Sequence, residues 1–347
     1  MNNPVLDIKD LHVTFAKRHG GPEMRAVAGV SLQIGSGETV GLVGESGSGK
    51  TTLGNAVLGL VRVTDGAIRF CDEDITNVSA RRWRSLAGQI QAVFQDPYRS
   101  LNPARTIGES IAEGIPSRLP GGAERAGKAV RARVFEALEQ TGLPPGWYSR
   151  YPRELSGGQR QRVAIARAIV GSPKLIICDE ITSALDLSVK AQILNLLSDL
   201  QEQLSLSFLF IAHDLPVVGH VSGRIVVMYK GRIVEEGTRE QVYADPRHPY
   251  TQSLMFASPV PDPVLQRSRR AQRRSMTPGG TAPLVGMESK GEVEPCSFAQ
   301  RCPFVASECL AEVPPLLEVA GGRKVACARI GEIPHRGEVQ LLADKSC

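Results

Sequence analysis

The feature that most constrains the fold is a glycine-rich segment between an apolar run and a helical pattern. Residues 44–51, GESGSGKT, match the pattern G-x-x-x-x-G-K-[ST]. They follow TVGLVG, which is typical of a buried strand, and they precede TTLGNAVLGL, which has a helical pattern. Glycines let the backbone wrap closely around phosphate, while successive N–H groups and the helix N-terminus supply positive potential. The segment therefore predicts the start of an α/β unit that binds phosphate groups.

The side chains of this loop have separate predicted roles. Lys50 can reach the β- and γ-phosphates of a nucleotide, and the Thr51 hydroxyl can bind Mg²⁺. A chance glycine turn before a helix is the alternative, and the flanking strand and helix argue against it. The residues predicted to contact the nucleotide here are Gly44, Glu45, Ser46, Gly47, Ser48, Gly49, Lys50, Thr51 and Thr52.

An acidic pair ends a second apolar run, KLIICDE at residues 174–180. A carboxylate at the carboxyl end of a strand sits where ligands bind in open α/β sheets. Asp179 can hold the shell of a Mg²⁺ ion through water, and Glu180 can polarise an attacking water as a general base. Taken alone, such a pair is more often a helix cap or a solvated turn, but a phosphate loop in the same chain favours the catalytic interpretation.

The remaining patterns indicate a mostly parallel sheet with helical connections. Residues 5–43 are expected to form short strands with turns, and 75–150 are expected to be mainly polar and helical. LSFLFIAHD at 206–214 predicts another buried strand, and RIVVMYKGRIVEEG at 224–237 predicts a hairpin. Helical stretches separate the middle strands, which favours parallel pairing.

Composition and charge exclude several classes of protein. The 41 Lys and Arg exceed the 36 Asp and Glu by only five, so a dedicated nucleic-acid binder is not expected. No run of about 18 apolar residues could span a bilayer, and the N-terminus lacks the pattern of a secretory signal. We therefore expect a cytoplasmic protein that can sit against a membrane partner, and seven cysteines there indicate metal, redox or burial roles rather than disulfides.

The order of motifs between residues 40 and 214 resembles the ATP-binding cassette (ABC) family. The phosphate loop is followed by Gln95 in VFQDP, by LSGGQ at 155–159, by LIICDE, by SALD ending at Asp186, and by His213. The resemblance implies an α/β fold: an ABC-type P-loop NTPase cassette with an antiparallel β subdomain and a helical subdomain at about 90–165. Ile181 stands where the family commonly has Pro, which affects the turn but removes no catalytic group.

The resemblance also implies how the chain would act. Two cassettes face each other head to tail, and each ATP lies between one phosphate loop and the other subunit's LSGGQ. Gln95 is expected to contact Mg²⁺ or the attacking water, and His213 the γ-phosphate. Phe15 is the candidate for stacking on adenine, with a buried core Phe as the alternative. The further residues expected to contact nucleotide are Ser156, Gly157, Gly158, Gln159 and Asp186. Ser156 could equally be a simple N-cap.

Two further segments resemble the oligopeptide/dipeptide importer branch: VFQDPYRSLNPARTIGESI and Arg247-His248-Pro249-Tyr250-Thr251. YRSLNP is closer to the second of that branch's two cassette subunits. The implied partners are a similar ATPase in a heteromeric sandwich, two permeases and, indirectly, an extracytoplasmic binding protein. Importers of nickel or metal chelates, glutathione and oligosaccharides share the branch, so the cargo stays open. A non-transport ATPase of DNA repair or translation is disfavoured, because such chains usually carry two cassettes and this one carries one set of motifs.

The C-terminal part is expected to be separate. We assign 1–257 to the cassette, 258–281 to a linker and 282–347 to a small domain with five of the seven cysteines. Cys296, Cys302, Cys309 and Cys327 lack a C-x2-C pair, which weakens a zinc site, and four thiolates can hold a [4Fe–4S] cluster. Similar importer tails imply such a cluster; zinc, unligated thiols and a regulatory role for the tail stay open. Cys347 is expected to be free, and Cys71 and Cys178 to be buried. The linker also carries a run of arginines, which is either solvated or in contact with anionic lipid headgroups. These residues are Arg267, Arg269, Arg270, Arg273 and Arg274.

Overall fold

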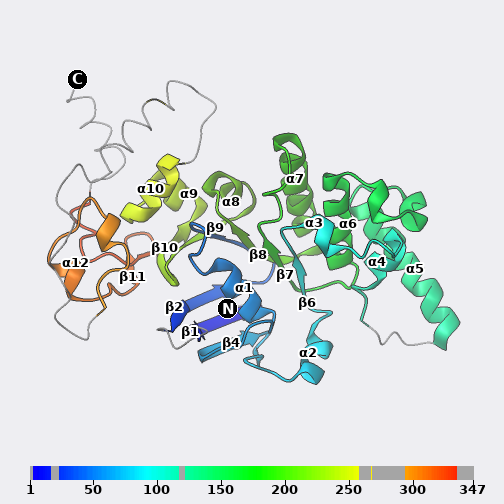
Figure 1. The fold of residues 1–347 in the computed structure, drawn as a ribbon, viewed down its shortest axis with the longest axis horizontal. Coiled ribbons are helices and arrows are strands. Elements are labelled where there is room, and N and C mark those ends of the chain that lie inside the picture. The colour runs from blue at the N-terminus through cyan, green and yellow to red at the C-terminus, as the bar shows by residue number, and fades with distance from the viewer. Residues whose placement is uncertain (1–2, 17–22, 117–121, 258–266, 268–293, 334–347) are drawn as a thin grey trace. The chain divides into compact units, whose positions relative to one another are not determined.

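A computed structural model describes residues 3–16, 23–116, 122–257, 267 and 294–333 of the chain (Figure 1). The chain divides into two compact units. The first unit combines residues 1–40 with 51–212, and the second combines 41–50 with 213–347. The boundaries expected from the sequence at 258 and 282, four of the five arginines of the linker, and Cys347 lie outside the described residues.

The first unit begins with an antiparallel sheet in the strand order β2-β1-β4-β5 (Figure 1). Its strands are β1 (Leu6–Phe15), β2 (Met24–Ile34), β4 (Asp65–Phe70) and β5 (Glu73–Asp74). Alternate residues of β2 are buried between Ala28 and Ile34, so one face of the strand packs inward. The antiparallel β subdomain that the sequence implied is therefore present.

A parallel group of strands follows in the same unit: β6 (Ile90–Val93), β7 (Leu175–Asp179) and β8 (Ser207–Ala212). β7 and β8 are almost fully buried, as expected of parallel strands covered on both faces. Residues 75–150 are mainly helical as expected, and β6 is an exception. Its four residues are too few to show a strand period, and pairing with β7 decides their conformation.

The helices of the first unit include a cluster that forms the helical subdomain. Within it α6 (Gly157–Ile169) contacts α3 (Pro97–Ser100), α4 (Ile107–Ala112) and α5 (Gly122–Gln140) (Figure 1). Thr106 and Glu109 form a capping box that starts α4. The other elements are α1 (Lys50–Val57), which begins at the unit boundary, α2 (Ala80–Leu86), α7 (Leu187–Leu204) and the short turns η1 (Pro145–Ser149) and η2 (Pro152–Glu154).

The second unit extends from part of β3 (Thr39–Val43), which crosses the boundary, to an antiparallel group of strands. β9 (Arg224–Tyr229) and β10 (Arg232–Thr238) form the expected hairpin, and β12 (Arg323–Val325) pairs with both β10 and β11 (Leu317–Val319). The mostly parallel expectation thus holds for β6–β8 and not for these strands. The helical elements here are α8 (Leu215–Val221), α9 (Arg239–Ala244), α10 (Pro249–Ala257), η3 (Ala299–Arg301) and α12 (Glu308–Ala311).

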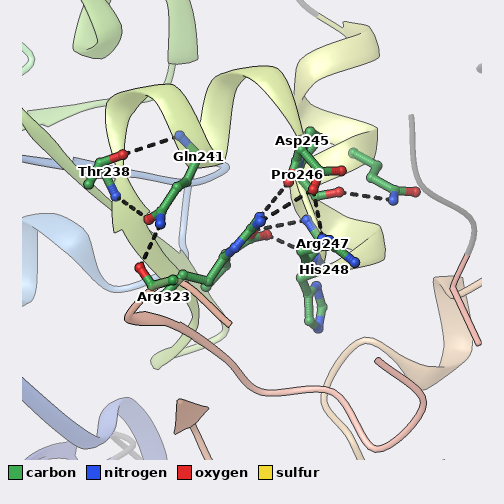
Figure 2. A network of polar contacts seen from close by, with 10 residues as sticks. Thr238, Gln241, Asp245, Pro246, Arg247, His248 and Arg323 are labelled. Atoms are coloured by element: carbon green, nitrogen blue, oxygen red, sulfur yellow. Dashed lines mark hydrogen bonds and ion pairs between the residues drawn. The ribbon is translucent and has the colours of Figure 1, made fainter. Parts of the chain in front are cut away.

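A buried polar network joins the C-terminal strands to the segment before α10 (Figure 2). The carboxylate of Glu235, which is fully buried, accepts the backbone N–H groups of Arg247 and His248 at 2.9 Å each. Arg323 lies 3.6 Å from Glu235 and 3.3 Å from the carboxylate of Asp245. Burial raises the pKa of Glu235, and these donors oppose that rise.

Aromatic packing adds a second connection within this unit. Phe298, from the cysteine-bearing segment, is 2% exposed and packs edge-on against Tyr229 of β9 with ring centroids 5.3 Å apart. Tyr250 of α10 completes the cluster, with its ring centroid 4.5 Å from that of Tyr229 and 5.5 Å from that of Phe298. Across the described ranges, no helix combines the length and the apolar character needed to cross a membrane.

Candidate active site

The phosphate loop leaves β3 after Val43 and ends where α1 begins at Lys50. A side chain at Gly44 would place its Cβ 2.1 Å from the carbonyl oxygen of Met228, so only glycine fits there. Gly49 has φ +102°, which an L side chain rarely adopts. The turn between them is fixed by two backbone hydrogen bonds, from Ser48 N–H to the Glu45 carbonyl at 3.2 Å and from Gly231 N–H to the Ser48 carbonyl at 2.8 Å.

Lys50 lies inside this loop and is only 4% exposed. Its ammonium group donates hydrogen bonds to the carbonyl oxygens of Gly44 at 2.8 Å and Glu45 at 2.9 Å. The positive charge is thereby held at the centre of the turn, where the loop would receive a phosphate. Ser46 and Gly47 are exposed at the tip of the loop.

The next part of the site lies at the carboxyl edge of the parallel strands in the first unit. Thr51 Oγ1 donates to Asp179 Oδ1 at 3.2 Å, which brings two of the three expected Mg²⁺ ligands together. Val93 of β6 pairs with Cys178 of β7, so Gln95 follows its strand at the same edge as Asp179 and Glu180. Hydroxyl, carboxylate and amide oxygens are the donors that Mg²⁺ prefers, so the residue types fit that ion.

Glu180 occupies a sharp turn directly after β7. Its φ is +47°, a conformation that non-glycine residues adopt rarely and that recurs at functional sites. Its N–H donates to the Ile211 carbonyl at 2.9 Å, and its own carbonyl accepts the N–H and hydroxyl of Ser183. Ile181, the departure from the family pattern, is 1% exposed and anchors the turn in the core. The side chain of Glu180 stays partly exposed, as a general base acting on water requires.

The LSGGQ segment starts α6 with a capping box. The Ser156 hydroxyl accepts the Gln159 N–H at 3.4 Å, and Gln159 Oε1 accepts the Ser156 N–H at 2.9 Å. Gly158 is required for packing, because a Cβ there would lie 2.4 Å from Val189 of α7. Gly157 meets only ordinary contacts at 3.7 Å and beyond. The capping role is therefore real, and the LSGGQ segment lies at the N-terminus of α6.

Three other predicted residues lie at element ends. Phe15 ends β1 and is 38% exposed, which excludes the buried-core alternative. Asp186 caps α7 by accepting the Val189 N–H at 3.0 Å. His213 follows β8 directly and is exposed.

Sequence reasoning missed two residues of the second unit that contact the phosphate loop. The Tyr250 hydroxyl accepts the Glu45 N–H at 2.7 Å, and Arg301 forms two hydrogen bonds with the Glu45 carboxylate at 2.7 and 2.8 Å. The Arg301 hydrogen bonds lower the pKa of Glu45 and keep it ionised. Tyr250 belongs to the Arg247-His248-Pro249-Tyr250 motif, so a signal was present in the sequence without a role attached to it.

The cysteines give mixed results. Cys178 is buried as expected, but the expectation that Cys71 is buried is wrong. Cys71 has φ +47° in the turn between β4 and β5 and lies exposed, 3.8 Å from the Lys174 ammonium. Tight turns of this kind lie at the surface whatever residue they carry.

The four C-terminal cysteines lie near one another in the second unit. Burial first, and then the nearby Cys327, Cys309 and Cys296, raise the pKa of Cys302 to about 12. Among the described residues no three His, Cys, Asp or Glu side chains are arranged to hold a metal ion. Thiolates are the ligands of iron–sulfur clusters, so the residue types suit such a group, and the thiols would have to close around it.

The fold and the site together define a P-loop ATPase of the ABC class. Residues 27–183 match the family described as ABC transporter, and residues 234–309 match the oligopeptide/dipeptide transporter C-terminal region. The chain is 44% identical to the oligopeptide transport ATP-binding protein OppF of Salmonella typhimurium, over 94% of this chain and 96% of that protein. It is equally similar to a putative peptide import ATP-binding protein of Brucella ovis, over 94% of this chain and 98% of that one. The chain belongs to the family of ABC transporter ATP-binding proteins.

Solved structures agree with this assignment. The cbiO1 subunit of the ABC transporter complex cbiONQ of Clostridium perfringens has a TM-score of 0.61 and 30% identity, covering 70% of this chain and 92% of its own. A dimeric ATP-binding cassette, MJ0796, in a post-hydrolysis state bound to ADP and Pi has a TM-score of 0.60 and 29% identity, covering 67% of this chain and 98% of its own.

Proposed function

We propose that the chain couples ATP hydrolysis to uptake of di- or oligopeptides, as the peripheral ATPase at the cytoplasmic face of the plasma membrane. The observation that carries this proposal is the match at residues 234–309 to the oligopeptide/dipeptide transporter C-terminal region. That match lies outside the segment that matches the ABC transporter family model. It therefore supports the oligopeptide/dipeptide branch of the family and not only the presence of a cassette. The identity to peptide import proteins over 94% of the chain supports the same branch.

The site residues divide the reaction between them. The loop N–H groups and Lys50 hold the β- and γ-phosphates, and Thr51, Asp179 and Gln95 would hold Mg²⁺, which neutralises charge on the phosphates when bound. Glu180 takes a proton from the attacking water, and His213 holds the γ-phosphate oxygen as the bond to the leaving group breaks. Phe15 stacks on the adenine ring. The remaining contacts come from the LSGGQ helix and from Asp186.

The LSGGQ helix acts on a nucleotide held by a second ATPase subunit. Its Ser156 and Gln159 already satisfy one another, so the free N-terminus can accept a γ-phosphate without rearranging the cap. The best-fitting assembly is a heteromeric sandwich with a related subunit, together with two permeases and an extracytoplasmic binding protein. The chain itself makes no contact with cargo in this assembly.

A groove beside Gln95 is the proposed contact for a permease. It is lined by Leu58, Leu60, Trp83, Phe94 and Arg167, all in the first unit. Leu60 is 62% exposed and Phe94 40%, so apolar surface borders the residue that contacts the reacting water.

Leu60→Asp should abolish permease-stimulated hydrolysis while the isolated chain hydrolyses ATP normally. Leu317→Asp, at an equally exposed leucine outside the groove, is the control. Equal effects of the two would reject the groove.

We also propose that Cys296, Cys302, Cys309 and Cys327 take up a [4Fe–4S] cluster when iron and sulfide are supplied. Anaerobic reconstitution should then load about four iron and four sulfide per chain. Cys309→Ser should lose the iron, and Cys71→Ser, at an exposed cysteine elsewhere, should keep it. One zinc per chain, or no metal at all, would reject the cluster.

The transport proposal is tested by uptake in cells. A dipeptide, a tetrapeptide, glutathione, nickel and an oligosaccharide are supplied in labelled form to cells with the native chain or with Lys50→Ala. Loss of peptide uptake alone is the expected result, because removing the Lys50 ammonium stops hydrolysis. If uptake of a different cargo is lost, the chain is still an importer subunit but its substrate is not a peptide. If no uptake is lost, the chain is an ATPase that serves no permease for these cargoes.

A further inference from the structure

Glu45 is the only carboxylate of the phosphate loop, and a residue 256 positions away holds it. Arg301 Nη1 donates to Glu45 Oε2 at 2.7 Å, and Nη2 donates to Oε1 at 2.8 Å. Two parallel bonds from one guanidinium fix the orientation of a carboxylate as well as its position. Arg301 ends η3, so the cysteine-bearing segment delivers this contact.

The backbone of the same residue is held from a second direction. Glu45 N–H donates to the Tyr250 hydroxyl at 2.7 Å, and Tyr250 is completely buried. The Arg301 guanidinium lies over the rings of Tyr229 and Phe298, with centroids at 5.8 and 5.7 Å. Main chain and side chain of Glu45 are therefore both set by residues of the second unit that lie 205 and 256 positions further along the chain.

The charge of Glu45 explains why such a contact matters. The loop must receive a nucleotide that carries several negative charges, and a free carboxylate one residue after Gly44 would repel it. Arg301 neutralises that carboxylate and fixes its orientation through the two hydrogen bonds. We propose that Arg301 is a positioning residue for nucleotide binding, which masks Glu45 and fixes the first turn of the loop. This inference rests on the proposed role of the loop as the nucleotide site.

The primary test is ATP binding by the purified full-length chain, measured by titration with a fluorescent ATP analogue at low and high salt. Arg301→Ala should raise Kd and the KM for ATP about fivefold at 50 mM salt, with kcat within twofold of native. The effect should shrink toward native at 500 mM salt, because the exposed carboxylate is screened. Arg239→Ala is the control, since Arg239 forms an exposed ion pair with Glu240 in the same unit and does not contact the loop.

A compensating variant separates masking from other roles. Glu45→Gln combined with Arg301→Ala should recover most of the lost affinity, because the unmasked charge is gone. Arg301→Lys keeps the charge without the two-pronged geometry and should fall between native and Arg301→Ala. The proposal is overturned if Arg301→Ala binds ATP like native, if its defect does not depend on salt, or if the double variant stays as weak as the single one.

The same titration contains the test of the proposed site. Lys50→Ala should lose nucleotide binding. If Lys50→Ala binds ATP as the native chain does, the loop is not the nucleotide site and the proposed function fails. If Lys50→Ala loses binding while Arg301→Ala does not, only the masking proposal fails.

Discussion

Two glutamates that follow or lie in strands show how differently the two units use the same side chain. Glu180, in the first unit, sits partly exposed in a strained turn after β7, with its backbone tied down. Glu235, in the second unit, is fully buried in β10. Its carboxylate accepts two backbone N–H groups and forms an ion pair with Arg323. A carboxylate that stays partly exposed at a strand end is accessible to water, whereas one buried against two backbone N–H groups and an arginine maintains structure.

Replacing Glu180 should give the largest effect of the changes that separate these roles. Glu180→Gln keeps the shape of the side chain and removes the proposed proton acceptor, so ATP hydrolysis should fall at least about 100-fold. ATP binding and the unfolding midpoint should stay close to native, because the turn is held by backbone bonds. Steady-state hydrolysis, nucleotide titration and thermal unfolding check this outcome. Hydrolysis near the native rate would remove Glu180 from the role of general base.

The matched substitution in the second unit should have the opposite profile. In Glu235→Gln one oxygen becomes an NH₂ group that faces a backbone N–H, and buried Arg323 loses part of its counter-charge. The expected loss is about 2–4 kcal/mol in the free energy of unfolding. The hydrolysis rate of the folded fraction at saturating ATP should stay near native. Denaturant unfolding and hydrolysis assays in parallel test it, and a variant of native stability would show that the network adds little.

The sequence could predict those features that neighbouring residues determine. The phosphate loop, the strand-end acids and the LSGGQ helix are each specified by neighbouring residues, through a glycine pattern, an apolar run or a cap. β6 is too short to show a period, and Cys71 was assigned by residue type although its turn decides its exposure. The role of Ile181 also needed the structure, because from the sequence alone this residue is only a departure from the family pattern.

The contacts of the C-terminal part could not be predicted in the same way. Arg301 and Glu45 are 256 residues apart, and Arg323 and Asp245 are 78 apart. No local period or motif links such positions, since only the folded chain brings them together. The Arg247-His248-Pro249-Tyr250 motif is visible in the sequence, but its contacts are not. In the folded chain the N–H groups of Arg247 and His248 donate to Glu235, and the Tyr250 hydroxyl accepts the Glu45 N–H.

The smallest effect should come from acid, through His248. Burial lowers the pKa of His248 to about 3, and its Nδ1 accepts the Tyr250 N–H at 3.1 Å, so the folded chain requires the neutral ring. The unfolded chain has an ordinary histidine pKa near 6.5. A depressed folded pKa contributes stability that is complete above about 6.5 and is lost as pH falls toward 3, and the loss by pH 5.5 is about 1.4 kcal/mol.

Glu235 acts against this trend, because its raised pKa favours the protonated form and acid therefore relieves its burial. The two contributions are separated with His248→Asn, whose side-chain oxygen can take the place of Nδ1 as acceptor but cannot be protonated in this range. Between pH 7.5 and 5.5 the native chain should lose about 1.4 kcal/mol more than His248→Asn in denaturant unfolding. Parallel pH profiles for the two chains would mean that the pKa of His248 is the same in the folded and the unfolded chain. In that case the acid sensitivity of the second unit would belong to its ion pairs, in which Arg323 bridges Glu235 and Asp245.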